Sequence, residues 1–404
     1  MELRLLARYC SFIGLIAAAC SPTESPPAIR AEASLDGATS ALGDPDGTVS
    51  IGIDAGADSS TESSTDVNPS PPTDGAPAPA CETGPGVVAL VDSGLYVYAM
   101  ALSDSTIFLG TPNGVWSVPR TGGTPSHVSG NDEVNSLAVD SMRVFWAGFC
   151  PQSPNKGAAP DPTCSTSTAL FAAPLSGGNY SVLAAGAWAT TGMLVDSSGI
   201  YGSDLSTMWV ASPNGGSPRT LTDPTVSPTA FAIQGDTVYV ASFGNPGSVV
   251  GIPKAGGANV TLVANQAHPG SIAADASGVY WSDWGTAGSW GALMRANLDG
   301  SAVTVLLAGE PSNAISISSL AIDQDDVFWT EQGAGHVMKI SKSGGAPQVI
   351  AEGLSGPNRI TTYGGNIYWL EQPFVDASIS VSDSGSAGAD AGAYMAATVM
   401  TACK

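Results

Sequence analysis

Few side chains in this 404-residue sequence have the chemistry of a catalytic group, and histidines are among the scarcest. There are three: His127, His268 and His336. An imidazole titrates near neutral pH and removes a proton from a substrate when a carboxyl group assists it. Asp283 and Glu331 are the acids that we pair with His268, which lies in the segment NQAHPG. Together they would suit proton abstraction followed by elimination or ring opening, as in a lyase or a lactonase.

A solvated loop histidine is the competing interpretation of His268, and we prefer it. Acid–base sites of this kind bring several histidines together with acids or a metal. We place only His268 among the loops that vary between repeats, whereas His127 and His336 fall elsewhere in their units. No serine-hydrolase elbow, phosphate-binding loop, zinc-ligand run or dinucleotide fingerprint stands in a convincing context. The sequence therefore predicts no catalysis, with the lyase or lactonase as the alternative.

The elements that position these residues repeat along the chain from Cys81 onward. Each unit has a strand ending near Asp, a short turn, a second strand that pairs Val or Ile with an aromatic residue, a third strand, a Gly-Gly turn and a fourth strand. The second-strand aromatics are Phe108, Phe145, Tyr201, Tyr239, Tyr280, Phe328 and Tyr368, which are 37, 56, 38, 41, 48 and 40 residues apart. A period of about forty residues with four strands predicts an all-β propeller. We expect seven four-stranded blades, with six or eight as alternatives.

The recurring aromatic words, such as GVYWSDWG at 278–285, have a structural explanation. In a strand, Val279 and Trp281 point to one face of the sheet and Tyr280 to the other. A blade packs against a neighbour on both faces, so we expect both sets to be buried as filler between blades. Each such ring removes about 150–250 Å² from water. Stacking on a cofactor is the alternative, but recurrence in every unit argues against it.

The seventh unit lacks a complete last strand after Tyr368. The segment VVALV at 87–91 has the right character to supply it, so an N-terminal strand is predicted to close the last blade and leave no open sheet edge. Cysteines support this closure. In an exported chain Cys81, Cys150, Cys164 and Cys403 would form two disulfides, with three pairings open. We expect Cys81–Cys403 as a clasp at the closure and Cys150–Cys164 as a local clip.

Residues 1–20 have the pattern of an export signal. Arg4 and Arg8 precede a short apolar run over 9–19, which is too short to span a bilayer. Small residues before Cys20 resemble a bacterial lipoprotein signal, although Ala17 stands where that family usually has Leu. The resemblance implies lipidation of Cys20 and anchoring in the envelope, with the outer membrane favoured because Ser21 follows. Cleavage after Ala19 and a secreted or periplasmic product is the alternative.

Residues 21–80 contain no aromatic residue, and ten acids oppose one base, Arg30, for a formal charge of −9. Such a composition cannot bury enough apolar surface to fold, so we expect an extended acidic linker before a propeller domain at 81–404. The whole chain has a formal charge of −22, which makes nucleic acid an improbable partner. The membrane would be reached through the N-terminal lipid.

The words YWSD (280–283), FWTE (328–331), FWAG (145–148) and IYWL (367–370) resemble the YWTD repeats of the low-density lipoprotein receptor type of propeller. The resemblance extends as a pattern over 87–372. Only 280–283 comes close to the full word, and that family builds six blades where this chain has seven units. The resemblance implies a binding platform rather than a reaction.

Strand direction alternates, so the loops fall on two faces. Turns between first and second strands and between third and fourth strands are short and uniform, whereas the remaining loops vary as binding loops on a rigid scaffold do. Acids, amides and tryptophans on the variable loops suit a glycan or a protein loop. The candidate ligand-binding residues are Trp188, Asp204, Asn245, His268, Asp283, Trp284, Glu331, Asn358 and Glu371. The alternative is that the acids only stabilise their own loops.

Calcium is the one cofactor worth weighing. Aspartates end several first strands, at Asp104, Asp140, Asp196, Asp275 and Asp323, and could be imagined as a ring of calcium ligands. Their position before tight turns favours turn capping instead. We therefore predict no metal and no cofactor, with calcium as the alternative. The sequence as a whole predicts an envelope lipoprotein whose propeller presents a binding face to a protein or a glycan.

Overall fold

The computed structural model describes residues 87–403 except for 93, 131–132, 150–167, 187–191, 205, 223–224, 245, 286–289, 311–313 and 373–396. All described residues belong to the unit Asn68–Lys404, and the unit Met1–Val67 lies outside them. The predictions for the export signal, Cys20, the acidic linker, Cys81, Cys150, Cys164, Trp188 and Asn245 therefore concern residues outside the described part.

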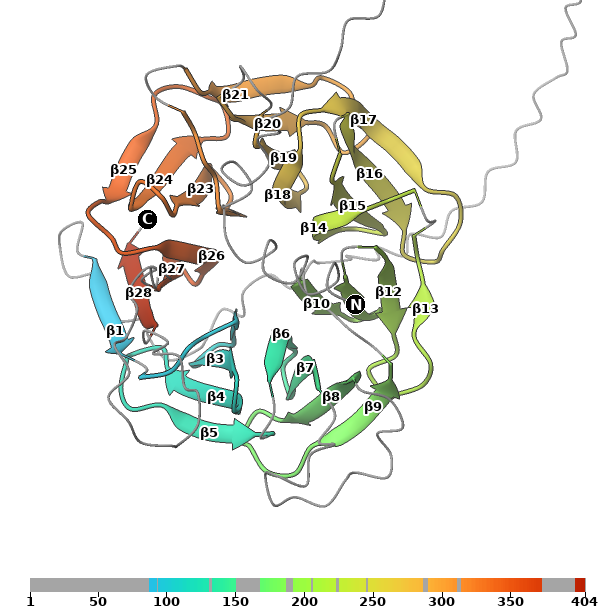
Figure 1. The fold of residues 1–404 in the computed structure, drawn as a ribbon, viewed down its shortest axis with the longest axis vertical. Helices are drawn as coiled ribbons and strands as arrows, with labels where there is room; N and C mark the ends of the chain where they lie inside the picture. Colours follow the sequence, from blue (N-terminus) through green and yellow to red (C-terminus); the bar gives the residue numbers. More distant parts are fainter. Residues whose placement is uncertain are drawn as a thin grey trace, which may run out of the picture. The chain divides into compact units, whose positions relative to one another are not determined.

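Seven antiparallel sheets of four strands follow one another around a ring in the described part of the chain (Figure 1). From the first to the fourth strand, blades 1 to 3 are β2 (Ala99–Leu102), β3 (Thr106–Thr111), β4 (Gly114–Pro119), β5 (Ser126–Ser129); β6 (Val134–Val139), β7 (Arg143–Phe149), β8 (Thr168–Pro174), β9 (Ser181–Ala185); and β10 (Gly192–Asp196), β11 (Gly199–Ser203), β12 (Met208–Ala211), β13 (Arg219–Thr220). Blades 4 and 5 are β14 (Pro228–Gln234), β15 (Thr237–Ser242), β16 (Gly247–Pro253), β17 (Val260–Gln266); and β18 (Pro269–Asp275), β19 (Gly278–Asp283), β20 (Ala292–Ala296), β21 (Thr304–Ala308). Blades 6 and 7 are β22 (Ser319–Ile322), β23 (Asp326–Glu331), β24 (His336–Ser341), β25 (Gln348–Ala351); and β26 (Pro357–Tyr363), β27 (Asn366–Glu371), β28 (Thr398–Cys403), β1 (Val88–Asp92). The prediction of an all-β propeller with seven four-stranded blades is confirmed.

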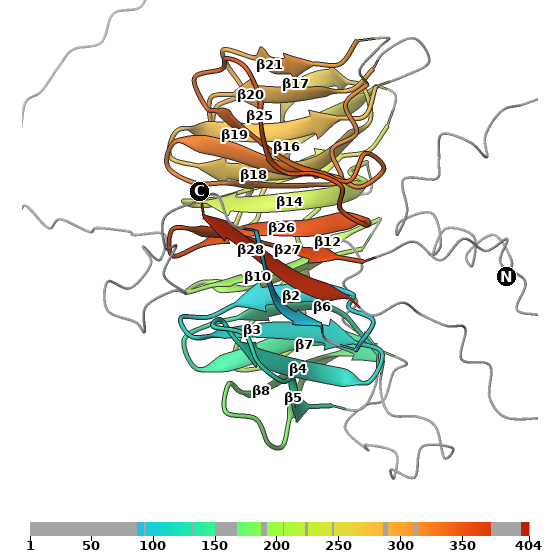
Figure 2. The ribbon, with the colours of Figure 1, turned by 90° about the vertical axis from the view of Figure 1, so that its left-hand side faces the viewer.

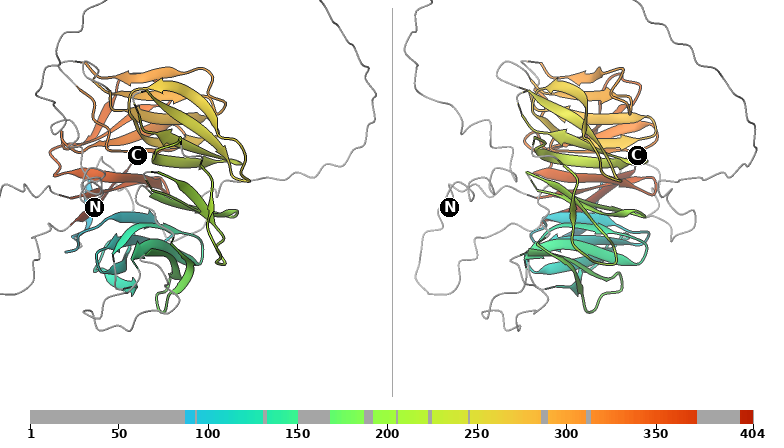
Figure 3. Two further views of the ribbon diagram at one scale, coloured as in Figure 1. Left: turned by 45° about the vertical axis from the view of Figure 1, so that its right-hand side comes forward. Right: turned by 90° about the vertical axis from the view of Figure 1, so that its right-hand side faces the viewer.

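The first strand of each blade faces the centre of the ring, and the strands run from one face of the ring to the other when it is seen edge-on (Figures 1, 2 and 3). Consecutive strands of each blade pair antiparallel, as β10 does with β11 and β11 with β12, so strand direction alternates from the inside outward. Every loop between strands therefore emerges on one of two faces. The candidate ligand-binding residues were predicted on the loops of one of these two faces.

The ring is closed by strands from both ends of the described region. Strand β1 pairs antiparallel with β28, with Val88 opposite Thr401 and Val91 opposite Val399, and so forms the outer strand of the last blade. The predicted closure by an N-terminal strand is confirmed. Cys403, at the end of β28, is disulfide-bonded, and all five other cysteines lie outside the described residues. The pairing with Cys81 stays a prediction.

The recurring aromatics fill the spaces between blades. All seven second-strand aromatics are buried, with 4% or less of their surface exposed, and Trp281, Trp329 and Trp369 are fully buried. The two sides of one strand serve different neighbours: Trp281 of blade 5 packs with Tyr239 of blade 4, whereas Tyr280 packs with Trp329 of blade 6. Both faces of a blade are apolar for this reason. The filler interpretation is confirmed.

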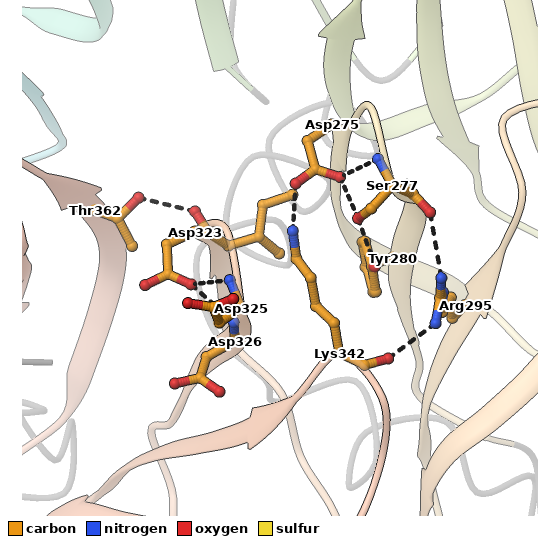
Figure 4. Close-up of polar contacts among 10 residues, drawn as sticks. Asp275, Ser277, Tyr280, Arg295, Asp323, Asp325, Asp326, Lys342 and Thr362 are labelled. Carbon is orange, nitrogen blue, oxygen red and sulfur yellow. Dashed lines mark hydrogen bonds and ion pairs between the residues drawn. The ribbon is translucent and has the colours of Figure 1, made fainter. Parts of the chain in front are cut away.

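Charged side chains lock some neighbouring blades together on the face of the short turns (Figure 4). Asp275 accepts hydrogen bonds from the backbone N–H and the hydroxyl of Ser277, at 2.8 and 2.6 Å, and this hydroxyl lies 2.9 Å from the Tyr280 hydroxyl. The second carboxylate oxygen binds Lys342, which comes from the next blade. Burial raises the pKa of Asp275, but the hydrogen bonds from Lys342 and Ser277 outweigh burial and hold it below the usual value.

The same arrangement recurs between blades 3 and 4, where Lys254 Nζ lies 2.5 Å from Asp196 and Ser198 bridges to Tyr201. Between blades 7 and 1, Arg120 takes the place of the lysine and donates to the Tyr368 hydroxyl at 3.0 and 3.2 Å. A tyrosine on the second strand and a cation in the next blade thus form one repeated contact between blades.

Turn capping is confirmed for four of the five aspartates considered as calcium ligands. Asp140, Asp196, Asp275 and Asp323 each accept hydrogen bonds from backbone N–H groups of the turn that follows. For Asp104 the prediction is wrong: its carboxylate accepts a hydrogen bond from the Tyr363 hydroxyl of blade 7. The N- and C-terminal blades meet there, and a phenol from the neighbouring blade is in reach of the turn.

Candidate binding face

The face opposite the short turns carries the loops between second and third strands and the crossings to the next blade. We call it the variable face. Among the described residues, these loops between second and third strands include 112–113 in blade 1 and 332–335 in blade 6. The short-turn face, by contrast, carries Gly-Gly turns in which Gly177, Gly256 and Gly344 have φ of 84°, 89° and 86°. Such left-handed backbone favours glycine, as the sequence predicted.

Three rings on the variable face come together across the boundary between blades 4 and 5. We call Phe243, His268 and Trp284 the aromatic cluster. The ring of Phe243 lies 5.0 Å from that of His268 and 6.1 Å from that of Trp284, measured between centroids. Phe243 is 38% exposed and Trp284 is 45% exposed, unlike the filler aromatics. Two large rings therefore remain open to solvent where binding loops are expected.

The backbone near the cluster is shaped to hold these rings. His268 has φ of 57°, a left-handed conformation that non-glycine residues seldom adopt. Its N–H donates to the Gly244 carbonyl at 3.2 Å, and its own carbonyl accepts from the Trp284 N–H at 3.2 Å. A Cβ on Gly270 would lie 2.4 Å from Trp284 Nε1, so a side chain at this position would displace the indole. Glycine at 270 lets the ring cross the start of β18.

The side chain of His268 has a defined hydrogen-bonding state. Its Nδ1 lies 2.9 Å from the Gly285 carbonyl oxygen, which can only accept a hydrogen bond. Nδ1 must therefore carry the proton. In the neutral ring, Nε2 then has a free lone pair and acts as an acceptor. The chemistry that the cluster adds to its two exposed rings is one hydrogen-bond acceptor.

Asp283 lies beside this histidine at the end of β19. Its Oδ2 accepts from the Ala267 N–H at 3.4 Å, and its Oδ1 is buried without a partner among the described groups. Burial raises the pKa of this carboxyl, while hydrogen bonds from Ala267 and Trp281 and the charge of His268 act in the opposite direction. A carboxylate with one oxygen buried and the other bonded to the crossing between β17 and β18 is poorly placed to reach a substrate.

The other acids of the candidate set also accept hydrogen bonds from groups of this chain. Glu331 accepts from Trp329 Nε1 at 3.0 Å and lies 3.4 Å from His336 Nδ1. Glu371 accepts from the Ser355 N–H at 2.7 Å. Asp204 accepts from the backbone N–H groups of Ser206 and Thr207, both at 2.7 Å. The contacts of Asp204 match the alternative of stabilising its own loop, whereas Glu371 binds the crossing that enters its blade, and none of these contacts involves His268.

His336 and His127 lie in different parts of their blades. The placement of His336 away from the variable face is wrong: it is the first residue of β24 and lies opposite Glu331 in the register, at the variable-face end. The loop between β23 and β24 is short, residues 332–335, so His336 follows it directly at the same face. His127 does lie elsewhere, on the outer strand β5, beside a shallow groove of about 590 Å³ that Ser129, Gly178 and Tyr180 also line.

Asn358 is partly buried near the start of β26, and its Oδ1 has no partner among the described groups. Trp188 and Asn245 lie outside the described residues. Phe243, which was not predicted from the sequence, lies directly after β15, beyond the last pair of β15 with β16, Ser242 and Ser248. Its position at the end of a second strand, in SFGNPG, was the available signal.

Charge is distributed unequally between the two faces. Among the described side chains, seven acids near the variable face are opposed by one base, Arg359, which gives a formal charge of −6; the acids are Glu133, Asp204, Asp283, Glu310, Glu331, Glu352 and Glu371. The other seven bases lie toward the short-turn face, namely Arg120, Arg143, Arg219, Lys254, Arg295, Lys339 and Lys342. Arg359 itself is partly buried, and desolvation lowers the pKa of its guanidinium. The variable face is therefore electronegative.

The described residues hold no group of three or more His, Cys, Asp or Glu side chains arranged to bind a metal ion. Nor do they include a helix with the length and apolar character needed to cross a bilayer.

Comparison with known proteins supports the fold and leaves the activity open. No family model and no curated protein matches the chain. Among solved structures, virginiamycin B lyase from Staphylococcus aureus aligns with a TM-score of 0.54 at 12% identity, over 79% of this chain and 98% of its own. YCF48 bound to D1 peptide aligns with a TM-score of 0.54 at 10% identity, over 81% of this chain and 99% of its own. At such identities the likeness shows the fold alone, and one fold serves unrelated functions.

Proposed function

We propose that this chain is an exported lipoprotein whose propeller presents the variable face as a binding platform for a protein or a glycan. The sequence supports this location through the signal-like residues 1–20, the lipidation candidate Cys20 and the acidic segment 21–80, which would hold the propeller away from the envelope. The outer membrane is the favoured site of anchoring. A Cys81–Cys403 disulfide would fasten the closed ring to this segment.

The observation that carries the proposal is the exposed aromatic cluster. Most large rings of the described residues are buried as filler, with Trp281, Trp329 and Trp369 fully enclosed, whereas Phe243, Trp284 and Trp290 are more than a third exposed. Phe243 and Trp284 are in mutual contact and exposed on the face whose loops vary, and large exposed rings on a polar surface are typical of binding sites. The structure of YCF48 bound to D1 peptide shows that a chain of similar fold holds a peptide.

The second candidate function is a lyase or a lactonase that uses His268 with Asp283 or Glu331. Two observations favour it: the contact of His268 Nδ1 with the Gly285 carbonyl leaves Nε2 as the acceptor of the neutral ring, and burial raises the pKa of the neighbouring Asp283, which would help that carboxyl to hold a proton. The buried Oδ1 of Asp283 and the engagement of Glu331 with Trp329 and His336 argue against it, because neither carboxyl is turned toward His268 Nε2 as a partner.

A capture experiment separates the two functions. The full chain, purified in detergent, is exposed to envelope extract and to a glycan panel, and each captured ligand is analysed by mass spectrometry before and after incubation. Three forms are compared: the wild type, Phe243→Ala/Trp284→Ala, and His268→Asn, in which asparagine tolerates the left-handed backbone. The binding proposal predicts an unchanged ligand, capture lost in the double aromatic variant, and most of the capture retained in His268→Asn. A ligand that the wild type alters chemically and His268→Asn leaves intact would establish the enzyme instead.

A further inference from the structure

We infer that the partner of the variable face is a protein segment that places an arginine side chain on the aromatic cluster. The inference rests on the proposed binding function and adds the chemistry of the partner. Its three supports are the exposure of Phe243 and Trp284, the lone pair on His268 Nε2 and the formal charge of −6 on the surrounding face.

The rings supply the contact surface for a cation. A guanidinium group is attracted to the face of an aromatic ring when it lies within about 6 Å of the centroid, and it stacks flat on it. The fold already uses this contact internally: the Arg120 guanidinium carbon lies 4.5 Å from the Tyr363 ring centroid, and that of Arg143 lies 4.7 Å from the Phe145 ring. Phe243 and Trp284 offer the same surface to solvent, and no cation–π contact of the described residues involves them.

The polar groups around the cluster match a donor rather than an acceptor. His268 Nε2 accepts a hydrogen bond, because Nδ1 donates to the Gly285 carbonyl. Arginine has five N–H donors and no acceptor, so one guanidinium could stack on a ring and still donate to Nε2. Asp283 lies behind the histidine, and its carboxyl adds negative potential without occupying the surface.

The negative electrostatic potential of the variable face also favours a basic protein segment. Glu310 and Glu352 are exposed on it, and its only described base, Arg359, is partly buried. An electronegative face steers a basic segment toward itself and repels an acidic one. An acidic segment such as 21–80 of this chain, with a formal charge of −9, lacks the charge that this face attracts. A neutral sugar would gain nothing from the charge, which is why we favour a basic protein segment over a glycan.

The test uses synthetic dodecapeptides that contain two arginines among Gly and Ser, labelled with a fluorophore and titrated with the full chain in detergent by fluorescence anisotropy. Matched peptides carry citrulline, which keeps the planar shape and removes the charge, or glutamate. We expect the arginine peptide to bind at least about tenfold more tightly than the citrulline peptide, and the glutamate peptide not to bind. Trp284→Ala and Phe243→Ala should each weaken the arginine peptide by roughly five- to thirtyfold.

Two controls keep the interpretation specific. Met142→Ala, which removes a 68% exposed side chain on the short-turn face, should leave binding unchanged. The double variant Glu310→Gln/Glu352→Gln should weaken binding and reduce its dependence on salt, whereas Asp236→Asn/Asp325→Asn on the short-turn face should do neither.

Equal binding of the arginine and citrulline peptides, or binding that Trp284→Ala and Phe243→Ala do not affect, would overturn the inference. A glycan or an acidic protein captured from the envelope through Phe243 and Trp284 would also overturn it, yet leave the binding platform intact. The proposed binding function itself would fail only on a separate result, namely that capture of no ligand depends on Phe243 and Trp284. The two failures are thus distinguishable.

Discussion

Replacing Trp281 by alanine should destabilise the propeller far more than the same change at Trp284, three residues further along the chain. Trp281 is fully buried between blades 4 and 5, and its Nε1 donates to Gln266 Oε1 at 3.1 Å. Truncation of a buried tryptophan costs about 3–5 kcal/mol of unfolding free energy through lost burial and the cavity left behind. The amide of Gln266, which is only 8% exposed, would also lose its partner, adding about 1–3 kcal/mol where water cannot replace the bond.

Trp284 is the matched control, since it is 45% exposed and contacts the edge of Phe243. Its truncation should cost less than about 1 kcal/mol. Both variants are compared with the wild type by urea denaturation followed by far-ultraviolet circular dichroism, which does not depend on the missing indole. A similar loss in the two variants, or a larger one for Trp284→Ala, would refute the division into buried filler and exposed binding rings.

Three further predictions test the closure, the contact between blades and the buried acid. Lys342→Met leaves the Asp275 carboxylate without its cation and should cost about 1–3 kcal/mol. Lys339→Met should cost less than about 1 kcal/mol, because the Lys339 side chain is more exposed than that of Lys342. The pKa of Asp275 is lower in the folded protein than in the unfolded chain. The stability that the ionised Asp275 contributes is therefore present above its unfolded pKa and is lost as pH falls through its folded pKa. The difference in urea midpoint between Lys342→Met and the wild type should accordingly shrink in acid. Deletion of all residues up to the end of β1 should remove the cooperative unfolding transition, since blade 7 would lose its outer strand; retention of the wild-type midpoint would exclude the closure. Asp283→Asn should raise the urea midpoint at pH 7 but not at acid pH, because burial raises the folded pKa and any stability gained by the protonated carboxyl is lost as pH rises through that value; a lowered midpoint at pH 7 would contradict this.

Much of the architecture could be predicted from the sequence because it depends on local periodicity. A buried aromatic such as Tyr280, flanked by Val279 and Trp281, recurs at nearly constant spacing, and only a sheet packed on both faces requires that pattern. The closing role of residues 87–91 followed from the missing last strand of the seventh unit. Glycine pairs at the turns between third and fourth strands were equally informative, since left-handed backbone favours them.

The site was harder to predict because it depends on contacts between blades. Phe243, His268 and Trp284 come from three different loops, and their distances follow from the angle between blades 4 and 5. Asp104 bonds to Tyr363, far away in sequence, so no local turn pattern could reveal it. The charge difference between the faces, by contrast, could have been counted from the sequence once the strand ends were assigned.

The central claim is that partners dock on the variable face, and site-specific photo-crosslinking tests it most directly. A benzophenone amino acid is placed at position 264, exposed near the variable-face end of β17, or at position 142 on the short-turn face, and the full chain is irradiated in envelope extract. We expect discrete adducts from position 264 that an excess of the arginine dodecapeptide removes, and none from position 142. Adducts formed only from position 142, or equally from both positions, would contradict the assignment of the binding face.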